Sequence, residues 1–520
     1  MRTFLQRHAE RILGVLSGFD RMRFRGTLLR LSGVGGMMHF LGRVGVLLKD
    51  FGGYAEGLTQ RLRRRVEEMA EAAGRPVQYL ERATDKEELV QKIRVEQGVG
   101  KQGWIAIFRT LENCTSYDIY RNRQTQQIDL RRRPRKCLHY YFYFLDRMFG
   151  LTQVRLQTWL PFDVRVVLNG REWLARQMDA AKIGYLRRDN CFAWIADFEG
   201  AQQLADRQAR MDWPKHLDRL LARVHPCHPQ WCRACPQSYY WTIEQSEWAT
   251  DVAFRSAESL SQWYPTLIRH GIETFQSPDV MRFLGHKMPA HGGVHGQYAG
   301  EVVSDLKQRP EGVRLKHRAG RNSLKMYDKQ GTVLRVETTL NDVRGLKVFR
   351  TKADDPQGQR QWLPLRKGVA DMSRRAQLSQ AANARYLERL ASVDAERTLK
   401  ELSAKLCRPV QAGERRYRAL NPLSPEDAKL LEIVARGEFQ ITGFRNRDLR
   451  AVWYGESEDP AQRRRQSSAT TRKLALLRAH GLIRKIPGTH RYLVTKPGAV
   501  AIAALLAARN ATLSQLTSAA

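Results

Sequence analysis

The stretch SATTRKLALLRAH, from Ser468 to His480, has the residue pattern of an amphipathic helix. Leu474 and Leu477 recur at a helical spacing on the inner side, and the cations of the stretch lie on the outer side. Gly481 follows directly and suits the end of a helix. The next segment, LIRKIPGTHRYLVT over 482–495, predicts two short strands around a Pro-Gly turn. The sequence therefore predicts a cationic helix followed by a cationic hairpin.

Two further helices are expected before these elements. Ser424, followed by Pro425 and two acids, predicts a helix start, because Ser is a good N-cap and Pro fits the first helical position. A second short helix fits Phe444 to Tyr454, after a glycine turn. Three helices and a hairpin in this order resemble winged-helix DNA-binding domains. The resemblance implies that the third helix enters a groove and that the hairpin contacts neighbouring phosphates.

DNA or RNA is the partner that this resemblance implies, and docking to another protein is the alternative. Arg447 begins the second helix, and three arginines precede the third. The remaining candidate contacts lie on the third helix and on the hairpin. The expected nucleic-acid-binding residues of this region are Arg447, Arg463, Arg464, Arg465, Arg472, Lys473, Arg478, Arg484, Lys485, His490 and Arg491.

The whole chain is strongly basic. It has 88 Lys and Arg against 53 Asp and Glu in 520 residues, for a formal net charge of +35. The cations are spread along the whole length, which favours a long polyanion lying across several domains. DNA is the partner expected first, RNA is compatible with the same charge, and a homodimer is also open.

No membrane partner is expected, because the sequence has neither an apolar run of spanning length nor an isolated basic amphipathic helix. The seven scattered cysteines fit a reducing compartment. The N-terminal stretch lacks the apolar core of a signal peptide. The expected location is therefore the cytoplasm, in association with the nucleoid.

The expected fold class is an α+β multidomain protein, with a mixed α/β N-terminal region and an antiparallel-sheet central region, followed by a helical connector and a C-terminal winged helix. The expected domains are an α/β domain at 1–120, a strand-rich and then helical domain at 121–300, an antiparallel sheet at 301–370, a helical connector and basic linker at 371–422, and the winged helix at 423–520. Within them, alternation predicts a strand from Phe24 onward. The segment SYYWTIEQSEWATDVAF, over 238–254, is expected to be part of a helical region.

The sharpest internal motif is GVRLKHRAGRNSLKMYDKQGTVLRVETTLND, residues 312–342, which alternates as three strands around two turns. On the second and third strands, Lys325, Tyr327, Arg335 and Glu337 have the spacing to share one sheet face. Lys325 is therefore a further candidate contact with nucleic acid.

This motif resembles the "YDK … LRxE" segment of plasmid and filamentous-phage replication initiators, which nick one DNA strand in rolling-circle replication. In that family a carboxylate on this hairpin helps to bind the divalent metal that polarises the phosphate, and a nearby tyrosine attacks it. The resemblance implies that Glu337 is the metal ligand and that Asp328 is a supporting acid.

The motif departs from the family at the nucleophile. The first strand reads RLKH, with no tyrosine, and the family's paired histidines are absent. His291 and His295 lie too far apart in a glycine-rich loop to replace them, and Tyr298 is the nearest replacement for the nucleophile. A purely structural hairpin, with Arg335 and Glu337 in a surface network, is the alternative.

A second hypothesis for a metal site uses carboxylates from several strands. Nucleases and transposases of the RNase H type need two or three acids, so that two metals can clamp the attacking and leaving oxygens. Asp20 follows an apolar strand, Asp146 lies between two strands, and Glu337 lies on a third. These three acids are the expected ligands of Mg²⁺ or Mn²⁺. Pairing of Asp20 with Arg21 and Arg23 is the alternative.

Two other segments were candidates for binding. HPCHPQWCRAC, over 225–235, contains a CxxC pair at Cys232 and Cys235, but a second pair is missing and the spacing is cramped, so zinc is not expected. IDLRRRPRKCLHYYFYF, over 128–144, joins arginines to aromatic residues. It can hold phosphates and stack unpaired bases. Alternatively, the rings fill the core and the arginines form a solvated edge.

Together these features predict a DNA-binding protein of the mobile-element or replication-initiator type, with metal-dependent cleavage or transfer of a DNA strand. As an enzyme it would be a nuclease or strand transferase that uses Glu337, Asp20, Asp328 and Asp146. The alternative is a non-catalytic regulator or an RNA-binding scaffold. The sequence has no Walker loop, so ATP dependence is not expected.

Overall fold

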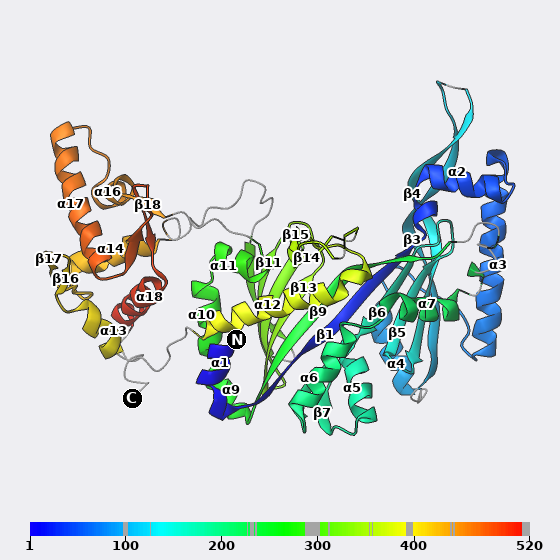
Figure 1. The fold of residues 1–520 in the computed structure, drawn as a ribbon, viewed down its shortest axis with the longest axis horizontal. Coiled ribbons are helices and arrows are strands. Elements are labelled where there is room, and N and C mark those ends of the chain that lie inside the picture. The colour runs from blue at the N-terminus through cyan, green and yellow to red at the C-terminus, as the bar shows by residue number, and fades with distance from the viewer. Residues whose placement is uncertain are drawn as a thin grey trace.

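The computed structural model describes residues 1–96, 102–124, 126–225, 227–228, 233, 237–286, 302–309, 312–352, 354–355, 357–391, 399–436, 439 and 443–511. The fold is mixed α/β and is built on one large sheet with several small ones (Figure 1). No helix within these ranges is both long enough and apolar enough to span a bilayer.

Eleven strands form the large sheet, in the order β10-β11-β12-β13-β9-β1-β6-β5-β4-β3-β2. Along the chain they are β1 (Ile12–Thr27), β2 (Gln78–Tyr79), β3 (Gly103–Arg121), β4 (Ile128–Asp146), β5 (Gly150–Gln157), β6 (Val164–Asn169), β9 (Tyr240–Phe254), β10 (Val302–Arg309), β11 (Gly312–Ala319), β12 (Asn322–Lys329) and β13 (Val333–Leu340). Only β2 and β3 pair in parallel; every other pair in this sheet is antiparallel. The expected regions before residue 370 therefore share one sheet, and residue 120 lies inside β3.

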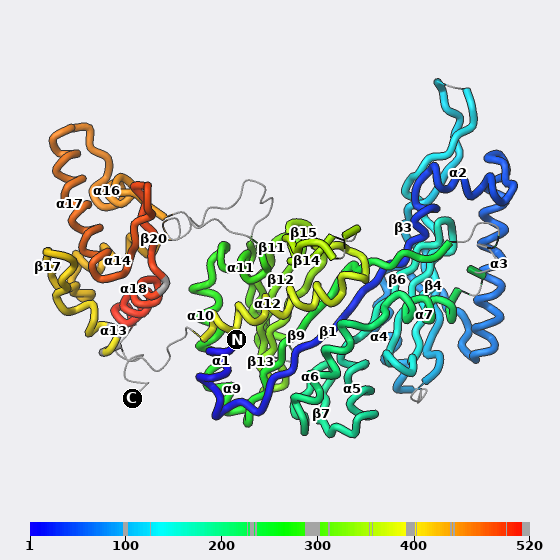
Figure 2. The backbone as a smooth tube through the Cα atoms, in the orientation of Figure 1, coloured from blue at the N-terminus to red at the C-terminus, as the bar shows by residue number. Residues whose placement is uncertain are grey.

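Two long central strands connect the halves of this sheet. β1 has 16 residues and β9 has 15, and they pair along almost their whole length. In Figure 2, β1 is the blue segment that runs diagonally from one half of the sheet to the other. The expected strand from Phe24 is thus the end of a longer strand. The expected helix over 238–254 is wrong, because β-branched and aromatic residues there are packed between β1 and β13.

The helices of the body cover the two halves of the sheet. They are α1 (Arg2–Arg7), α2 (Val34–Arg43), α3 (Phe51–Ala72), α4 (Lys86–Glu96), α5 (Gly170–Ala180), α6 (Phe198–Gln208), α7 (Trp213–Val224), α9 (Ala257–Ser261), α10 (Tyr264–Thr274), α11 (Ser277–Phe283) and α12 (Met372–Leu390). Two small hairpins complete the body: β7 (Tyr185–Arg188) with β8 (Cys191–Ile195), and β14 (Lys347–Arg350) with β15 (Gln361–Pro364).

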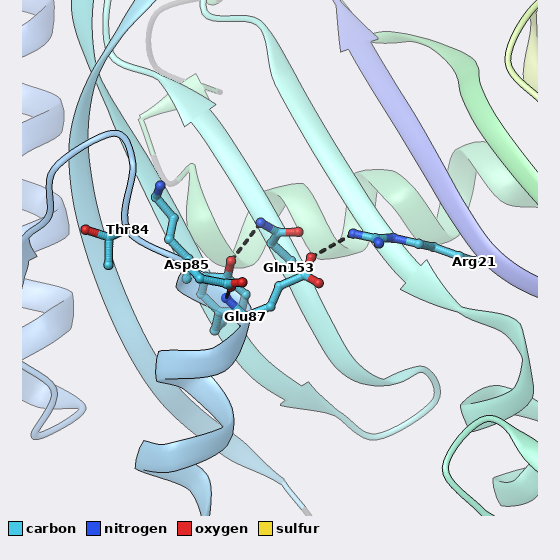
Figure 3. Close-up of a pocket in the computed structure, with 7 residues that line it drawn as sticks. Arg21, Thr84, Asp85, Glu87 and Gln153 are labelled. Atoms are coloured by element: carbon cyan, nitrogen blue, oxygen red, sulfur yellow. Dashed lines mark hydrogen bonds and ion pairs between the residues drawn. The ribbon is translucent and has the colours of Figure 1, made fainter. Parts of the chain in front are cut away.

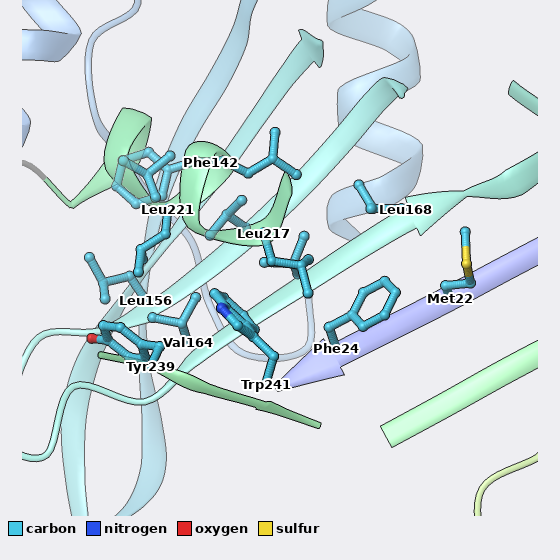
Figure 4. Close-up of a cluster of buried hydrophobic side chains, with 14 of the residues drawn as sticks. Met22, Phe24, Phe142, Leu156, Val164, Leu168, Leu217, Leu221, Tyr239 and Trp241 are labelled. Carbon is cyan, nitrogen blue, oxygen red and sulfur yellow. The ribbon is translucent and has the colours of Figure 1, made fainter. Parts of the chain in front are cut away.

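The hydrophobic core of the β3–β6 half includes residues of α7. The Asp212 side chain caps this helix by accepting from the backbone of Lys215, and Pro214 lies in the first turn. Leu217 and Leu221 recur at a helical spacing and pack in the same cluster as Phe24 and Trp241 (Figure 4). Full burial of each such side chain stabilises the fold by roughly 1.5–3 kcal/mol.

Helix α12 packs on the other half of the sheet, against β13 and β9. The buried Asn383 of this helix donates to the carbonyls of Trp248 and Val336 at 3.1 and 2.9 Å and to Thr250 at 3.1 Å. It also accepts from Thr338 at 2.6 Å. These bonds fix α12 on one face of β9 and β13. Because side chains alternate along a strand, Glu247, Asp251, Arg335 and Glu337 point to the opposite face.

The C-terminal elements have a hydrophobic core of their own. They are α13 (Leu399–Leu406), β16 (Val410–Ala412), β17 (Arg415–Tyr417), α14 (Pro425–Ala435), β18 (Phe444–Arg445), α16 (Asn446–Tyr454), α17 (Pro460–Ala479), β19 (Ile483–Lys485), β20 (Arg491–Val494) and α18 (Lys496–Asn510). The expected helix start at Ser424 is confirmed, because its side chain accepts from the backbone of Asp427. The expected third helix begins eight residues earlier than predicted, so Arg463, Arg464 and Arg465 lie inside α17.

Candidate metal centre

A bulge in β1 sets the direction of the Asp20 side chain. The pairing of β1 with β9 shifts register between Phe19 and Met22. Both of these side chains lie in the hydrophobic core, so the two residues between them, Asp20 and Arg21, can both point to the other face. A regular strand would place only one of them there. The bulge therefore brings a carboxylate and a guanidinium side by side.

Glu247 of β9 and Glu337 of β13 lie beside Asp20. Each of the three carboxylates offers an oxygen, and these oxygens lie within 4.8 Å of one another. The acids meet because β13, β9 and β1 are neighbours in the sheet. Carboxylate oxygens in such a cluster are ligands that suit Mg²⁺ and Mn²⁺. The structure thus brings together two of the expected ligands and adds Glu247, which the sequence analysis missed.

Two side chains of β12 bind Glu337. The Lys325 ammonium donates to its Oε1 at 2.6 Å, and the Tyr327 hydroxyl donates to its Oε2 at 2.9 Å. Lys325 also lies 3.7 Å from Glu247. The expected shared face of these strands is confirmed. However, the Lys325 side chain is only 18% exposed and pairs with both acids, so it is poorly placed for an open phosphate contact.

Arg335 connects the acids to a deeper ion-pair network. Its Nε and one terminal nitrogen donate to Asp251 at 2.5 and 2.8 Å, and its other terminal nitrogen donates to Asp20 at 3.0 Å. Arg171, at the start of α5, lies 3.0 Å from Asp251. Asn190, on the turn between β7 and β8, donates to Asp20 at 2.5 Å. The alternative of a surface network of Arg335 and Glu337 is wrong about its location, because both side chains are buried.

The cluster has an excess of negative charge. Four carboxylates, of Asp20, Glu247, Asp251 and Glu337, face three cations that pair with them, of Lys325, Arg171 and Arg335. Arg21, beside Asp20, pairs instead with Glu87. Burial, and then the nearby Glu337, raises the pKa of Glu247 to about 7. Burial also raises the pKa of Asp20, and Glu337 and Asp251 add to this against the attraction of Arg335. Without a metal, the cluster therefore tends to retain a proton.

Glu337 is held in its charged form. Burial opposes its ionisation, but Lys325, Arg335 and the Tyr327 hydroxyl outweigh burial and lower its pKa. Glu337 stays ionised, whereas Glu247 and Asp20 bind a proton more readily. Such a cluster can exchange its proton for a metal ion.

A pocket of about 350 Å³ is lined by Arg21 of the β1 bulge and by residues of β4, β5 and the start of α4 (Figure 3). Arg21 pairs there with Glu87 at 2.7 Å. The lining residues are Arg21, Thr84, Asp85, Lys86, Glu87, Tyr143 and Gln153.

The other two expected acids lie apart from this cluster. Asp146 is the last residue of β4, directly before the turn to β5, and it accepts from Arg219 at 3.0 Å and from the backbone of Met148 and Phe149. Asp328 follows Tyr327 on β12, so alternation turns its side chain to the opposite face. Among the described residues, the three-acid cluster includes neither of them. Their expected roles as ligands or catalytic acids do not fit this geometry.

Several other candidates fall outside the described residues, namely Cys232, Cys235, His291, His295 and Tyr298. Of the possible zinc ligands in HPCHPQWCRAC, over 225–235, the described residues are His225, Cys227 and His228. His225 and Cys227 are buried, and burial raises the pKa of the Cys227 thiol.

Most of the expected C-terminal contacts are exposed. On α17 these are Arg463, Arg464, Arg465, Arg472 and Arg478; on the hairpin of β19 and β20 they are Arg484, Lys485 and His490; and Arg447 is on α16. Arg491 is half-buried beside the carbonyl of Gly443. Lys473 differs from the others, because it pairs with Glu426 and its ammonium lies 4.1 Å from the centre of the Trp453 ring. Its side chain therefore binds α14 and α16.

Comparison of the chain with protein-family models, curated proteins and solved structures finds no significant match.

Proposed function

We propose that this chain is a nucleic-acid-binding protein of the mobile-element or replication-initiator type, which cuts or transfers a DNA strand with Mg²⁺ or Mn²⁺. The observation on which this rests is the meeting of Asp20, Glu247 and Glu337 from three adjacent strands. The metal would neutralise charge on the reacting phosphate and activate the attacking oxygen. The protein side chains hold the three carboxylates in place before any substrate binds.

Crowded cations on both sides of the carboxylates support a polyanionic substrate. On β1 and β6, burial and the neighbouring Arg21 and Arg165 lower the pKa of Arg23. On β11, burial, Lys325 and Arg314 lower the pKa of Lys316. Cations repel one another at both places, and a line of phosphates would relieve that repulsion. A strand lying across this face would pass over the acidic cluster.

The C-terminal elements support a DNA-binding role. The order α14, β18, α16, α17, β19, β20 is that expected of a winged helix, with α17 as the groove helix and the β19–β20 hairpin as the wing. The exposed arginines of α17 and the cations of the hairpin would then face the DNA backbone. Binding of this kind would place the protein on the nucleoid. A protein partner for the same surface, RNA in place of DNA, and a homodimer are outcomes that the binding experiments can detect.

A second function, non-catalytic regulation or RNA scaffolding, is favoured by one specific contact set. Both carboxylate oxygens of Glu337 already accept hydrogen bonds, one from Lys325 and one from Tyr327. If these bonds persist when nucleic acid binds, the acids only balance neighbouring cations. The two functions differ in whether a divalent metal displaces Lys325 from Glu337.

The test is cleavage of labelled single- and double-stranded DNA with Mg²⁺ or Mn²⁺. Wild type should cut, and Glu337→Gln and Asp20→Asn should retain binding and lose about 10²-fold or more in rate. Glu199→Gln, at an exposed acid on α6, is the matched control and should cut normally. Mn²⁺ binding is measured by calorimetric titration of each variant. A folded variant that does not bind Mn²⁺ has lost only the metal site.

Three results would decide between the functions. Cutting that persists in a folded Glu337→Gln protein would remove the metal centre from the mechanism. DNA or RNA binding without cutting under any metal would leave the non-catalytic function. The absence of any nucleic-acid binding at low salt would contradict the proposal as a whole.

A further inference from the structure

A two-stranded arm projects from the edge of the large sheet. β3 and β4 pair from Gly103 with Leu145 to Arg121 with Ile128, but β5 pairs with β4 only from His139 onward. The outer part of the hairpin, residues 113–136, therefore continues as two strands and forms the arm. In Figure 1 it is the cyan ribbon that rises beyond α2.

The base of the arm is firmly attached to the body. The Tyr117 hydroxyl donates to the carbonyl of Leu31 at 2.5 Å, and the Ser116 hydroxyl donates to that of Leu160 at 2.7 Å. Tyr117 and Leu130 are buried in the main core. The arm is thus an ordered projection whose direction is set by the core.

The charge of the arm is strongly positive. It contains six arginines and one lysine against two aspartates. Asp118 is shared by three arginines of the opposite strand, at 3.4 Å from Arg131, 2.9 Å from Arg133 and 3.8 Å from Arg135. These three arginines alternate along β4 and so lie on one face. One carboxylate cannot neutralise three guanidinium groups.

The other cations of the arm are less compensated still. They are Arg121, Arg123, Arg132 and Lys136, and all four are exposed. Within the described part of the chain, no carboxylate lies at ion-pair distance from any of these four cations. Tyr117 and Arg132 pair across the strands, so Arg132 lies on the face opposite to Arg131 and Arg133. Both faces of the arm are therefore cationic.

The tip adds side chains that can read bases. Its sequence from Arg121 to Gln127 is RNRQTQQ. A bond from the backbone of Asn122 to the carbonyl of Gln127 closes the turn, at 2.8 Å. Arg123, Gln124 and Gln126 are exposed there. Arginine and the side-chain amides of asparagine and glutamine are the groups that recognise guanine and adenine in the major groove.

We propose that this arm inserts into the major groove of double-stranded DNA. A major groove admits a two-stranded ribbon, and a ribbon with cations on both faces can contact the phosphates of both groove walls while its tip reaches the bases. The inference rests on the proposed function in requiring DNA as the partner. It adds a duplex contact distant in sequence from both the metal centre and the C-terminal elements.

The experiment compares full-length wild type with the triple variant Arg121→Ala, Arg123→Ala, Arg132→Ala. The matched control is Arg64→Ala, Arg207→Ala, Arg210→Ala, which removes three exposed arginines from α3 and the region of α6. Binding to a duplex is measured over a range of salt. The arm variant should bind about tenfold or more weakly, and its slope of log affinity against log salt should fall by about two to three, because up to three phosphate contacts are lost. The control should keep the wild-type slope.

Methylation protection then identifies the groove. Wild type should protect guanine N7, which lies in the major groove, and the arm variant should lose this protection at part of the site. Protection confined to adenine N3, in the minor groove, would overturn the inference. So would an arm variant with the wild-type slope and protection, or one that loses only single-strand or RNA binding. If wild type binds no DNA, the proposed function fails as well; if wild type binds and cuts but the arm variant matches it, only the arm inference fails.

Discussion

The guanidinium of Arg335 lies 3.0 Å from the carboxylate of Asp20, although 315 residues separate them in the chain. Arg335 is on β13 and Asp20 is in the bulge of β1, and Asp251 of β9 binds the same guanidinium between them. One buried cation therefore holds the three central strands together. It also fixes the position of an acid of the proposed metal centre.

Replacement of Arg335 with Ala is expected to destabilise the protein strongly. The change leaves Asp20 and Asp251 buried without their main cation, and loss of one partner of a buried ion pair costs about 3–5 kcal/mol. Unfolding in urea measures the effect. Arg344→Ala, which removes an exposed side chain paired with Asp342, is the control and should leave the midpoint nearly unchanged. If the Ala variant is too unstable to purify, Arg335→Lys should show an intermediate loss; wild-type stability in either variant would contradict the network.

The metal should stabilise the protein more at pH 8 than at pH 6. The pKa of Glu247 is raised to about 7 by burial and by Glu337, so in the folded state it keeps its proton up to about pH 7. In the unfolded chain this carboxyl loses its proton near the ordinary glutamate pKa of 4.5. The contribution of Glu247 to stability therefore falls as the pH rises from that value to about 7. Metal ions must displace the proton below pH 7 and meet a free carboxylate above it.

The measurement is the shift in Tm caused by Mn²⁺ at the two pH values. Saturation at about 100 times Kd would add about 2.7 kcal/mol of stability at pH 8. Glu247→Gln removes one of the two acids whose pKa is raised, so its shift should be smaller and should depend less on pH. Equal shifts in wild type at pH 6 and pH 8 would contradict the displacement of a proton from Glu247.

Asn383→Ala should destabilise the half of the sheet under α12. Its side chain makes hydrogen bonds with four groups on β9 and β13, and the truncation removes all four bonds at once. Among these groups, Thr250 keeps other side-chain partners, Ser17 and Gln380. The expected loss is about 2–4 kcal/mol in the free energy of unfolding. Gln377→Ala, at an exposed position of the same helix, should change it by less than about 0.5 kcal/mol. A loss below about 0.5 kcal/mol in Asn383→Ala would contradict the role of the hydrogen bonds, because Ala is the better helix former and so cannot itself cause a loss.

Removal of Arg472 and Arg478 from α17 should weaken DNA binding. Both side chains are exposed, and the loss of two phosphate contacts should lower the salt slope of binding by about two. Lys473→Ala should act differently, because Lys473 pairs with Glu426 and stacks on Trp453. It should lower Tm with a smaller effect on the slope. An unchanged slope after loss of both arginines would favour a protein partner for this surface.

The sequence was sufficient for elements whose pattern is local. The three strands over 312–342 alternate strictly, so their faces and the meeting of Lys325, Tyr327 and Glu337 could be predicted. The helix start at Ser424 and the hairpin after Gly481 also follow from local capping and turn residues. Glu337 was identified in the same way, through its position on a hairpin.

The rest of the site depends on contacts between distant strands. β9 is buried throughout only from Trp248 to Phe254, and Glu247 itself is half-buried. The sequence predicts a helical region for this segment, so its strand faces were not assigned. Two of its acids, Glu247 and Asp251, lie four residues apart on one strand face, and this spacing was the available signal. The bulge that directs Asp20 depends on the pairing of β1 with β9, which no local pattern specifies.

The long pairing of β1 with β9 also has a mechanical consequence. Because both strands run through the two halves of the sheet, the halves cannot rotate against each other without breaking many ladder hydrogen bonds at once. The carboxylates of the central strands are therefore held at fixed positions relative to one another. Under the proposed function, a nucleic acid would have to bend or unstack to meet these carboxylates, because the two halves of the sheet do not close around it.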